Sequence, residues 1–187
     1  IIPRTRLLMG GAIAALEHVL KNGGIAGNLA GGTHHAHHDF GSGYCIFNDL
    51  AVCSLMALSR YKLTKVAVLD LDVHQGDGTA TILRDESQVL TISVHCKQNF
   101  PFRKSESDYD FELLANAGDE ELLETVAQAL DITKQFEPQL ILFQAGVDGL
   151  ATDALGKLNI SREGMRSRNE MVFDFAVEHS IPTVVFM

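Results

Sequence analysis

Two segments rich in histidine and acidic residues carry the residue types of a hydrolytic metal site. The segment DLDVHQGDG, residues 70–78, alternates Asp70, Asp72 and His74. Alternate side chains of an extended backbone point the same way, so two carboxylates and an imidazole are expected close together. Burying these groups is costly unless a cation or hydrogen bonds compensate them. Oxygen and imidazole ligands suit Zn²⁺, and a catalytic zinc keeps three protein ligands with a fourth position open for water. The segment therefore predicts part of a zinc site, with Asp72 and His74 as two ligands.

A third ligand should come from the end of another strand. Asp148, in the segment QAGVDGLATD, is the candidate that directly follows a long apolar stretch. A lone Asp-x-Asp pair more often caps a turn, and a lone histidine is more often a hydrogen-bonded core residue. The joint pattern, together with Asp148, favours a metal site over that interpretation.

Residues 31–45, GGTHHAHHDFGSGYC, place four histidines within five positions. Consecutive side chains of an extended segment diverge, so His34 and His35 cannot easily bind one metal ion together. Each ring can instead approach a water molecule at the metal if a carboxylate orients its far nitrogen, and Asp70 and Asp77 are available for this. A neutral histidine would then take a proton from the water, while its neighbour stays cationic or passes a proton to the leaving group.

The other two histidines of this tract lack carboxylate partners in the sequence pattern. We expect His37 and His38 at the rim of the site or in solvent. A histidine tag is a poor interpretation, because the tract is internal, follows a predicted strand and is interrupted by Ala36.

Apolar, β-branched segments alternate with segments of helical periodicity along the chain. This pattern is typical of a parallel sheet covered by helices on both faces. We predict an α/β fold of three layers, helix, sheet and helix, around an open and mainly parallel sheet. Strands are expected at about 25–30, 65–71, 88–94, 139–145 and 181–187, and helices at about 5–22, 48–61, 119–136 and 161–179. Residues 96–118 are polar and irregular, so we expect a long loop of a kind that is often functional.

The unusual polar residues fall at the ends of the predicted strands. THH follows the first strand, DLDVH ends the second, SVH ends the third and AGVD ends the fourth. In an open parallel sheet, ligands bind in the crevice beyond the carboxyl ends of the strands. The sequence therefore predicts that residues remote in the chain meet at this edge of the sheet.

Length and composition exclude several other classes of function. A chain of 187 residues, of which 46% are hydrophobic and 21% charged, suits one globular domain. The net charge of −9 leaves no basic surface for phosphate backbones, so we expect no direct nucleic-acid binding. The apolar stretches are far shorter than the roughly 20 residues that cross a bilayer, and we expect no membrane association. The cysteines, Cys45, Cys53 and Cys96, are odd in number and not in metal-ligand spacing, which indicates a reducing compartment, most simply the cytoplasm.

In combination, these motifs resemble the zinc-dependent histone deacetylases of the arginase/deacetylase fold. The resemblance covers nearly the whole chain, through NLAGGTHHA, GSGYCIFND, VAVLDLDVHQGDGT, NFPFRKSESD, QAGVDGLATDALGKLNIS and IPTVVFM. The DVHQGDG and AGVDxLxxDxLGxLxIS variants are more similar to class IV and its bacterial relatives than to class I or class II.

The resemblance implies a role for each residue of the two segments. The ligands of one zinc ion per chain would be Asp72, His74 and Asp148. The tandem catalytic histidines would be His34 and His35, paired with Asp70 and Asp77 respectively.

The resemblance also implies a substrate channel and a second ion. Gly43 and Tyr44 fall where the family lines a narrow acyl-lysine channel, with Phe100 as its opposite wall. Asp70 and Ser93 match contributors to a monovalent-cation site near the active centre, which usually holds potassium.

The implied reaction is hydrolysis of the amide bond of an N-acyl-lysine in a protein, or of a small acylated amine. Zinc polarises the amide carbonyl and holds a water, His35 or His34 removes the proton of that water, and a proton then reaches the leaving amine. Three alternatives stay open: a deacetylase of acetylpolyamines or other small amides, a non-catalytic acyl-lysine-binding or scaffold protein, and an arginase-like amidinohydrolase. The last would need more bridging carboxylates, for two manganese ions, than the segment at His34 and His35 offers. No sequence feature specifies an oligomeric state.

The family pattern extends beyond both ends of the chain. Its electrophilic tyrosine lies in a glycine-rich segment after the last strand, and an N-terminal segment supplies a further strand and a loop acid that grips the substrate. Neither segment falls within residues 1–187, so we expect a single, incomplete deacetylase-like catalytic domain. Loss of one transition-state hydrogen-bond donor typically costs about 10²–10³ in rate, which predicts low activity for these residues alone.

Overall fold

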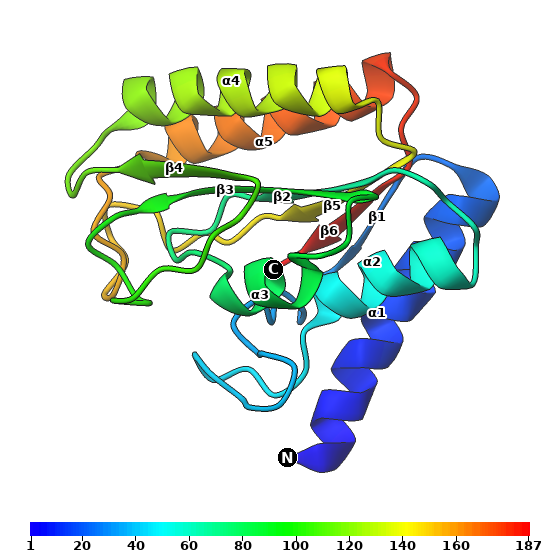
Figure 1. Ribbon diagram of the computed structural model, residues 1–187. Helices are drawn as coiled ribbons and strands as arrows, with labels where there is room; N and C mark the ends of the chain where they lie inside the picture. The colour runs from blue at the N-terminus through cyan, green and yellow to red at the C-terminus, as the bar shows by residue number, and fades with distance from the viewer.

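A six-stranded sheet forms the middle layer of the computed structural model, which describes residues 1–187 (Figure 1). The strand order is β1-β6-β5-β2-β3-β4, and every neighbouring pair is parallel. The strands are β1 Ile25–Asn28, β2 Val66–Asp70, β3 Val89–Cys96, β4 Tyr109–Leu113, β5 Leu140–Gln144 and β6 Thr183–Phe186. The predicted α/β fold is confirmed, with a sheet that is parallel throughout.

Helices cover both faces of the sheet, as Figure 1 shows. On one face lie α4 Asp119–Phe136 and α5 Arg162–Glu178, and on the other lie α1 Ile2–Asn22, α2 Asp49–Ser59 and α3 Asp77–Leu83. Strands β2, β3 and β5 are buried along their whole length, as their continuous apolar sequences predict. Two apolar cores result, one on each side of the sheet. None of the helices combines the length and apolar character that a transmembrane span requires.

Two of the predicted helices begin with groups that stabilise a helix N-terminus. Ser161 accepts a hydrogen bond from the main-chain N–H of Gly164 at 2.9 Å and so caps α5. Helix α4 opens with three acidic residues, and Glu121 accepts a hydrogen bond from the main-chain N–H of Gly118 at 2.8 Å. Negative charge in this first turn suits the positive end of the helix dipole.

The expectation of one long loop over residues 96–118 is wrong, because β4 lies within it. This strand is at the edge of the sheet, pairs with β3 alone, and alternates apolar with acidic residues in the sequence YDFEL. Its residues Phe111 and Leu113 pack against the core. Helix α3 is a second element that the sequence pattern does not predict, because its residues 77–83 span only about two turns.

Strand β2 lies where the order of the sheet reverses. The connection from β2 to β3 runs through α3 on one face, and the connection from β4 to β5 runs through α4 on the other face. Such a switch point is where open α/β sheets bind ligands, beyond the carboxyl ends of the strands. Asp70 ends β2, so the segment that follows it enters this crevice.

Candidate active site

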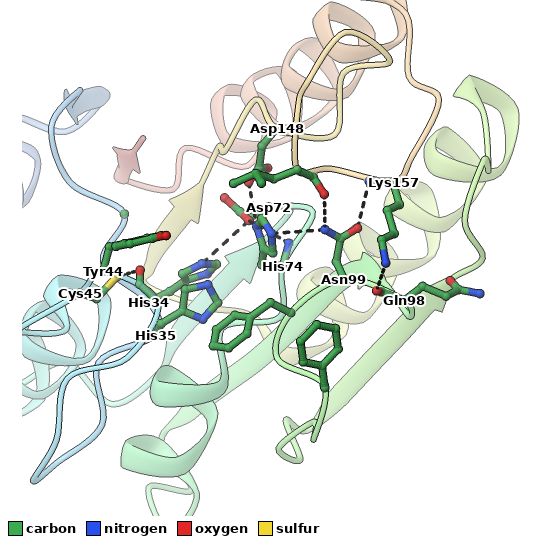
Figure 2. A pocket seen from close by; sticks show the side chains of 15 residues that line it. His34, His35, Tyr44, Cys45, Asp72, His74, Gln98, Asn99, Asp148 and Lys157 are labelled. Atoms are coloured by element: carbon green, nitrogen blue, oxygen red, sulfur yellow. Dashed lines mark hydrogen bonds and ion pairs between the residues drawn. The ribbon is translucent and has the colours of Figure 1, made fainter.

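A pocket of about 670 Å³ opens beyond the carboxyl ends of β2 and β5 (Figure 2). It gathers side chains from segments that are remote in the sequence, as the position of these segments at strand ends predicts. The residues singled out from the sequence that line it are His34, His35, Gly43, Tyr44, Asp72, His74, Phe100 and Asp148. Asp70, Asp77 and Ser93 lie behind this lining and are buried.

Asp72, His74 and Asp148 form a cluster that can hold one metal ion. Their ligand atoms lie within 4.8 Å of one another. His74 Nδ1 is 3.1 Å from Asp72 Oδ1 and 2.9 Å from Asp148 Oδ2. Ligand atoms around a tetrahedral zinc with bonds of about 2.0–2.1 Å lie about 3.3 Å apart, so the observed separations fit a single ion.

The backbone after β2 holds both carboxylates of this cluster in place. The main-chain N–H of His74 donates to Asp72 Oδ1 at 2.8 Å, and that of Val73 donates to Asp148 Oδ1 at 3.1 Å. The second oxygen of Asp148 is thereby left facing His74. Gly146 permits this approach of the two strand ends, since a Cβ at that position would overlap the Asp72 carboxylate.

The charges of this cluster are those of a cation-binding site. Burial acts to lower the pKa of His74, but hydrogen bonds to Asp148 and Asp72 outweigh it and raise the pKa to about 10. Burial likewise acts to raise the pKa of Asp72, yet His34 and His74 hold it below its usual range. The carboxylates thus hold a proton on His74, and a metal ion at the same place would neutralise the same negative charge.

His34 and His35 each meet the carboxylate that the sequence pattern made available. The Nδ1–H of His34 donates to Asp70 Oδ2 at 2.7 Å, and that of His35 donates to Asp77 Oδ1 at 2.7 Å. The two rings lie side by side with centroids 4.1 Å apart, next to Asp72 and His74 in Figure 2. Because Nδ1 is occupied in both rings, Nε2 is the nitrogen left for chemistry in the pocket.

The two histidines differ in charge near neutral pH. Burial lowers the pKa of His35, and the adjacent His34 lowers it further. Burial acts in the same direction on His34, but Asp70 and Asp72 outweigh it and raise the pKa of His34 to about 9. The pair therefore offers one neutral imidazole and one imidazolium.

The expectation that His37 lacks a carboxylate partner is wrong. Its Nε2 lies 3.2 Å from Asp77 Oδ2, its Nδ1 lies 2.8 Å from Thr81 Oγ1, and its ring stacks on Phe40. Helix α3 causes this arrangement, because it presents Asp77 and Thr81 one turn apart on the same side. Asp77 therefore bridges His35 and His37, whereas His38 is exposed, as predicted.

Residues expected along the substrate channel lie on two sides of His35. A Cβ at Gly43, whose φ is +51°, would overlap the His35 ring, so the backbone lies directly against it. The Phe100 ring packs edge-on against His35, with centroids 5.0 Å apart. Tyr44 has a φ of +63° and turns a fully exposed ring to the mouth of the pocket.

Asn99 and Lys104 position the segment that carries Phe100, and neither belongs to a motif of the sequence. The buried Asn99 amide donates to the main-chain oxygen of Leu155 at 2.9 Å and accepts from the N–H of Lys157 at 3.0 Å. The Lys104 ammonium donates to main-chain oxygens of the same segment, including that of Asn99 at 2.7 Å. These contacts join two loops, and no local pattern in the sequence signals them.

Asp70 and Ser93, the expected contributors to a monovalent-cation site, are paired across β2 and β3. The Ser93 hydroxyl lies 2.9 Å from His95 Nδ1. His95 is fully buried, and its Nε2 has no hydrogen-bond partner. The structure thus places both expected residues together, with a buried neutral histidine beside them.

Lowering the pH from 7 to 5 should destabilise the protein through His95. Burial lowers the pKa of His95 to about 4, below the ordinary value near 6.5 of an unfolded chain. As the pH falls through 6.5, His95 becomes protonated in the unfolded chain, whereas in the folded protein it stays neutral until about pH 4. Unfolding therefore becomes more favourable. By pH 5 the loss amounts to about 2 kcal/mol.

Urea titrations at pH 7 and pH 5, on the protein and on a His95→Gln variant, measure this loss. The free energy of unfolding of the variant should fall less, by about 2 kcal/mol, because the other histidines contribute equally to both proteins. Identical pH dependence of the protein and the His95→Gln variant would contradict the expectation.

Comparisons with known proteins agree with this geometry. The histone deacetylase domain matches residues 1–187. An uncharacterised protein of Picosynechococcus sp. is 40% identical over 97% of this chain and 61% of its own length, and histone deacetylase 2 of Arabidopsis thaliana is 35% identical over 96% of this chain and 47% of its own length.

The fold is similar to that of a solved relative. The crystal structure of an HDAC homolog from Aquifex aeolicus has a TM-score of 0.85 and 28% identity, over 98% of this chain and 52% of that structure. The chain thus spans about half to three-fifths of the length of these proteins. The domain match extends from the first residue to the last, and the chain belongs to the histone deacetylase domain family.

Proposed function

We propose that this chain carries the metal site and the proton-transfer residues of a zinc-dependent hydrolase that removes acyl groups from lysine side chains. The observation that carries the proposal is the meeting of the Asp72, His74 and Asp148 cluster with two carboxylate-paired histidines in one pocket. A zinc ion held by the three cluster residues would polarise the amide carbonyl and lower the pKa of a water molecule.

The two histidines have different roles in the proposed reaction. His35 is neutral near pH 7 because burial lowers its pKa, and its Nδ1–H is held by Asp77, so its Nε2 is the base that takes a proton from the attacking water. His34, whose Nδ1–H is held by Asp70, would in its protonated form stabilise the negative charge that develops on the substrate oxygen. His35 then returns its proton to the leaving amine.

The walls beside His35 suit a thin, extended side chain. Gly43 and Phe100 approach the ring from two sides, and Tyr44 stands at the mouth of the pocket. A narrow channel of this kind suits the alkyl chain of an N-acyl-lysine, and an acylated polyamine is the second candidate substrate.

Two finer assignments belong to the same proposal. Potassium would bind near Asp70 and Ser93, an assignment supported by their pairing across β2 and β3. A class IV-like relationship is supported by the DVHQGDG and AGVDGLATDALGKLNIS segments.

Native mass spectrometry with an amide-hydrolysis assay tests the proposed function. We expect one zinc ion per chain, removed by chelator, and release of free lysine amine from an acetyl-lysine peptide in preference to an N-acetylated diamine. Preference for the diamine would indicate a polyamine deacetylase. Zinc without turnover of either compound would indicate a binding or scaffold protein if it persists in a chain extended to include the family's tyrosine segment. Two manganese ions per chain would indicate an amidinohydrolase, and the absence of any metal would overturn the mechanism.

Phe100→Ala should raise the KM for the acetyl-lysine peptide about tenfold and change kcat less. The reason is that burying an aromatic ring against the substrate contributes about 1.5–3 kcal/mol, and 1.4 kcal/mol corresponds to a factor of ten. Steady-state kinetics of amine release measure both constants. Phe47→Ala, which removes a half-exposed ring outside this pocket, is the control, and an unchanged KM for Phe100→Ala would remove Phe100 from the channel.

A further inference from the structure

Arg168, in α5, is among the largest fully buried side chains of the protein, with 1% of its surface exposed. An arginine is almost never fully buried unless its charge is compensated. None of its hydrogen bonds reaches a carboxylate; all of them go to main-chain carbonyls or to the Asn169 amide oxygen. The burial of this charged guanidinium without a hydrogen-bonded carboxylate therefore needs a physical explanation.

The guanidinium joins the two backbone segments that present the metal-ligand candidates. Nη1 donates to the main-chain oxygens of Leu71 at 2.9 Å and Gly146 at 2.8 Å, and Nη2 donates to that of Ala145 at 3.1 Å. Leu71 directly precedes Asp72, and Gly146 lies two positions before Asp148. One side chain thus contacts both arms of the cluster from the α5 side of the sheet.

These carbonyls lie just beyond the end of the sheet, where the neighbouring strand no longer donates backbone hydrogen bonds to them. The ladder between β2 and β5 ends at the pair Asp70 and Gln144, and its last bond runs from the N–H of Leu71 to the oxygen of Gln144. Beyond it no backbone hydrogen bond joins the two segments, although Leu71 and Ala145 are still buried. Buried carbonyls need hydrogen-bond partners, and the planar fork of a guanidinium can serve several at once.

The charge of Arg168 also suits this position. Burial lowers the pKa of Arg168 to about 10, so the group remains protonated at neutral pH. The lowering of the Arg168 pKa is opposed by the negative charges of Asp72, Asp148 and Asp70. The guanidinium thus interacts electrostatically with these carboxylates without hydrogen-bonding to them. A positive charge behind the cluster leaves the faces of the carboxylates free for a metal ion in the pocket.

We infer that Arg168 is a positioning residue that sets the separation of Asp72 and Asp148 and thereby the affinity of the site for a divalent metal ion. The inference rests on the proposed function, because it assumes that this cluster binds the metal. Lysine cannot replace Arg168, since a single ammonium cannot reach the carbonyls of both strand ends in the geometry of the fork.

The test measures the zinc affinity of the protein by competition with a chromophoric chelator, together with the absorption spectrum of the Co²⁺-loaded protein. Arg168→Met should weaken zinc binding about 10–100-fold, the range seen when groups that orient metal ligands are removed. Arg168→Lys should fall between this variant and the unsubstituted protein. Both should change the Co²⁺ spectrum, which reports the geometry of the ligands rather than the stability of the fold.

Val172→Ala is the matched control, because Val172 is fully buried one turn further along α5 and contacts the core rather than the site. It should lower the free energy of unfolding and leave the zinc affinity and the Co²⁺ spectrum unchanged. If Val172→Ala weakens zinc binding as much as Arg168→Met does, the effect is one of stability and the inference is overturned.

Two further results separate the inference from the proposed function. If Arg168→Met does not fold, Arg168→Lys decides: zinc affinity equal to that of the unsubstituted protein overturns the inference, and a weaker affinity with an altered Co²⁺ spectrum supports it. Failure of the unsubstituted protein to bind zinc or Co²⁺ would overturn the proposed function itself, and the inference with it.

Discussion

Asp148→Ala should leave the protein without bound zinc under conditions in which the unsubstituted chain carries one ion. Only Asp72 and His74 would remain, and zinc sites with a catalytic open position use three protein ligands. Loss of a group that merely orients a ligand costs about 10–100-fold in metal affinity, so loss of a ligand should cost more. Native mass spectra recorded with and without chelator give the metal count directly.

The structure supplies two comparison variants for this experiment. Asp148→Asn keeps an oxygen that can accept the hydrogen bond from the main-chain N–H of Val73 but removes the negative charge, so it separates anchoring from charge. Asp131→Ala removes an exposed carboxylate of α4 and should retain the zinc. One zinc ion per chain in Asp148→Ala would show that Asp148 is not a ligand and would require a different metal centre.

His35→Ala should lower kcat for the acetyl-lysine peptide by about 10²–10⁴ while zinc stays bound, because general acid–base catalysis contributes a factor of this size. The ring holds the Nε2 that faces the pocket and is the neutral member of the histidine pair. Asp77→Asn should lower kcat as well, since it removes the carboxylate that orients His35. The measurement is kcat together with the zinc content of each variant.

His38→Ala is the matched control, because it removes an exposed histidine three positions away in the same segment. Its kcat should equal that of the unsubstituted protein. Loss of zinc from His35→Ala would contradict the assignment, since it would make His35 part of the metal site, and an unchanged kcat would remove it from the proton transfer.

Much of the fold and of the candidate site can be predicted from the sequence, because strands and the polar residues at their ends have recognisable local sequence patterns. Continuous apolar segments predict buried parallel strands, and β2, β3 and β5 are indeed buried throughout. The parallel direction of these strands then brings the polar residues at their carboxyl ends to one edge. Asp148 could be matched with Asp72 and His74 by this rule, although more than 70 residues separate them.

Elements that lack a clear local sequence pattern, such as β4 and α3, could not be predicted in this way. Strand β4 is short, lies at the sheet edge and is set within the largely polar segment 96–118, and helix α3 is too short to show helical periodicity. The contact between His37 and Asp77 follows from α3, so it could not be anticipated while that helix was unknown.

The sequence by itself determined which residue types stand at the strand ends and therefore what chemistry this edge of the sheet can hold. Only the tertiary structure decided which groups hold those residues in place. Arg168 meets its partners through main-chain carbonyls of distant segments, and every residue carries a carbonyl, so no residue pattern marks such a partner. The charges of His34 and His35 were likewise set by the fold, because burial and the placement of Asp70 and Asp77 determine their pKa values.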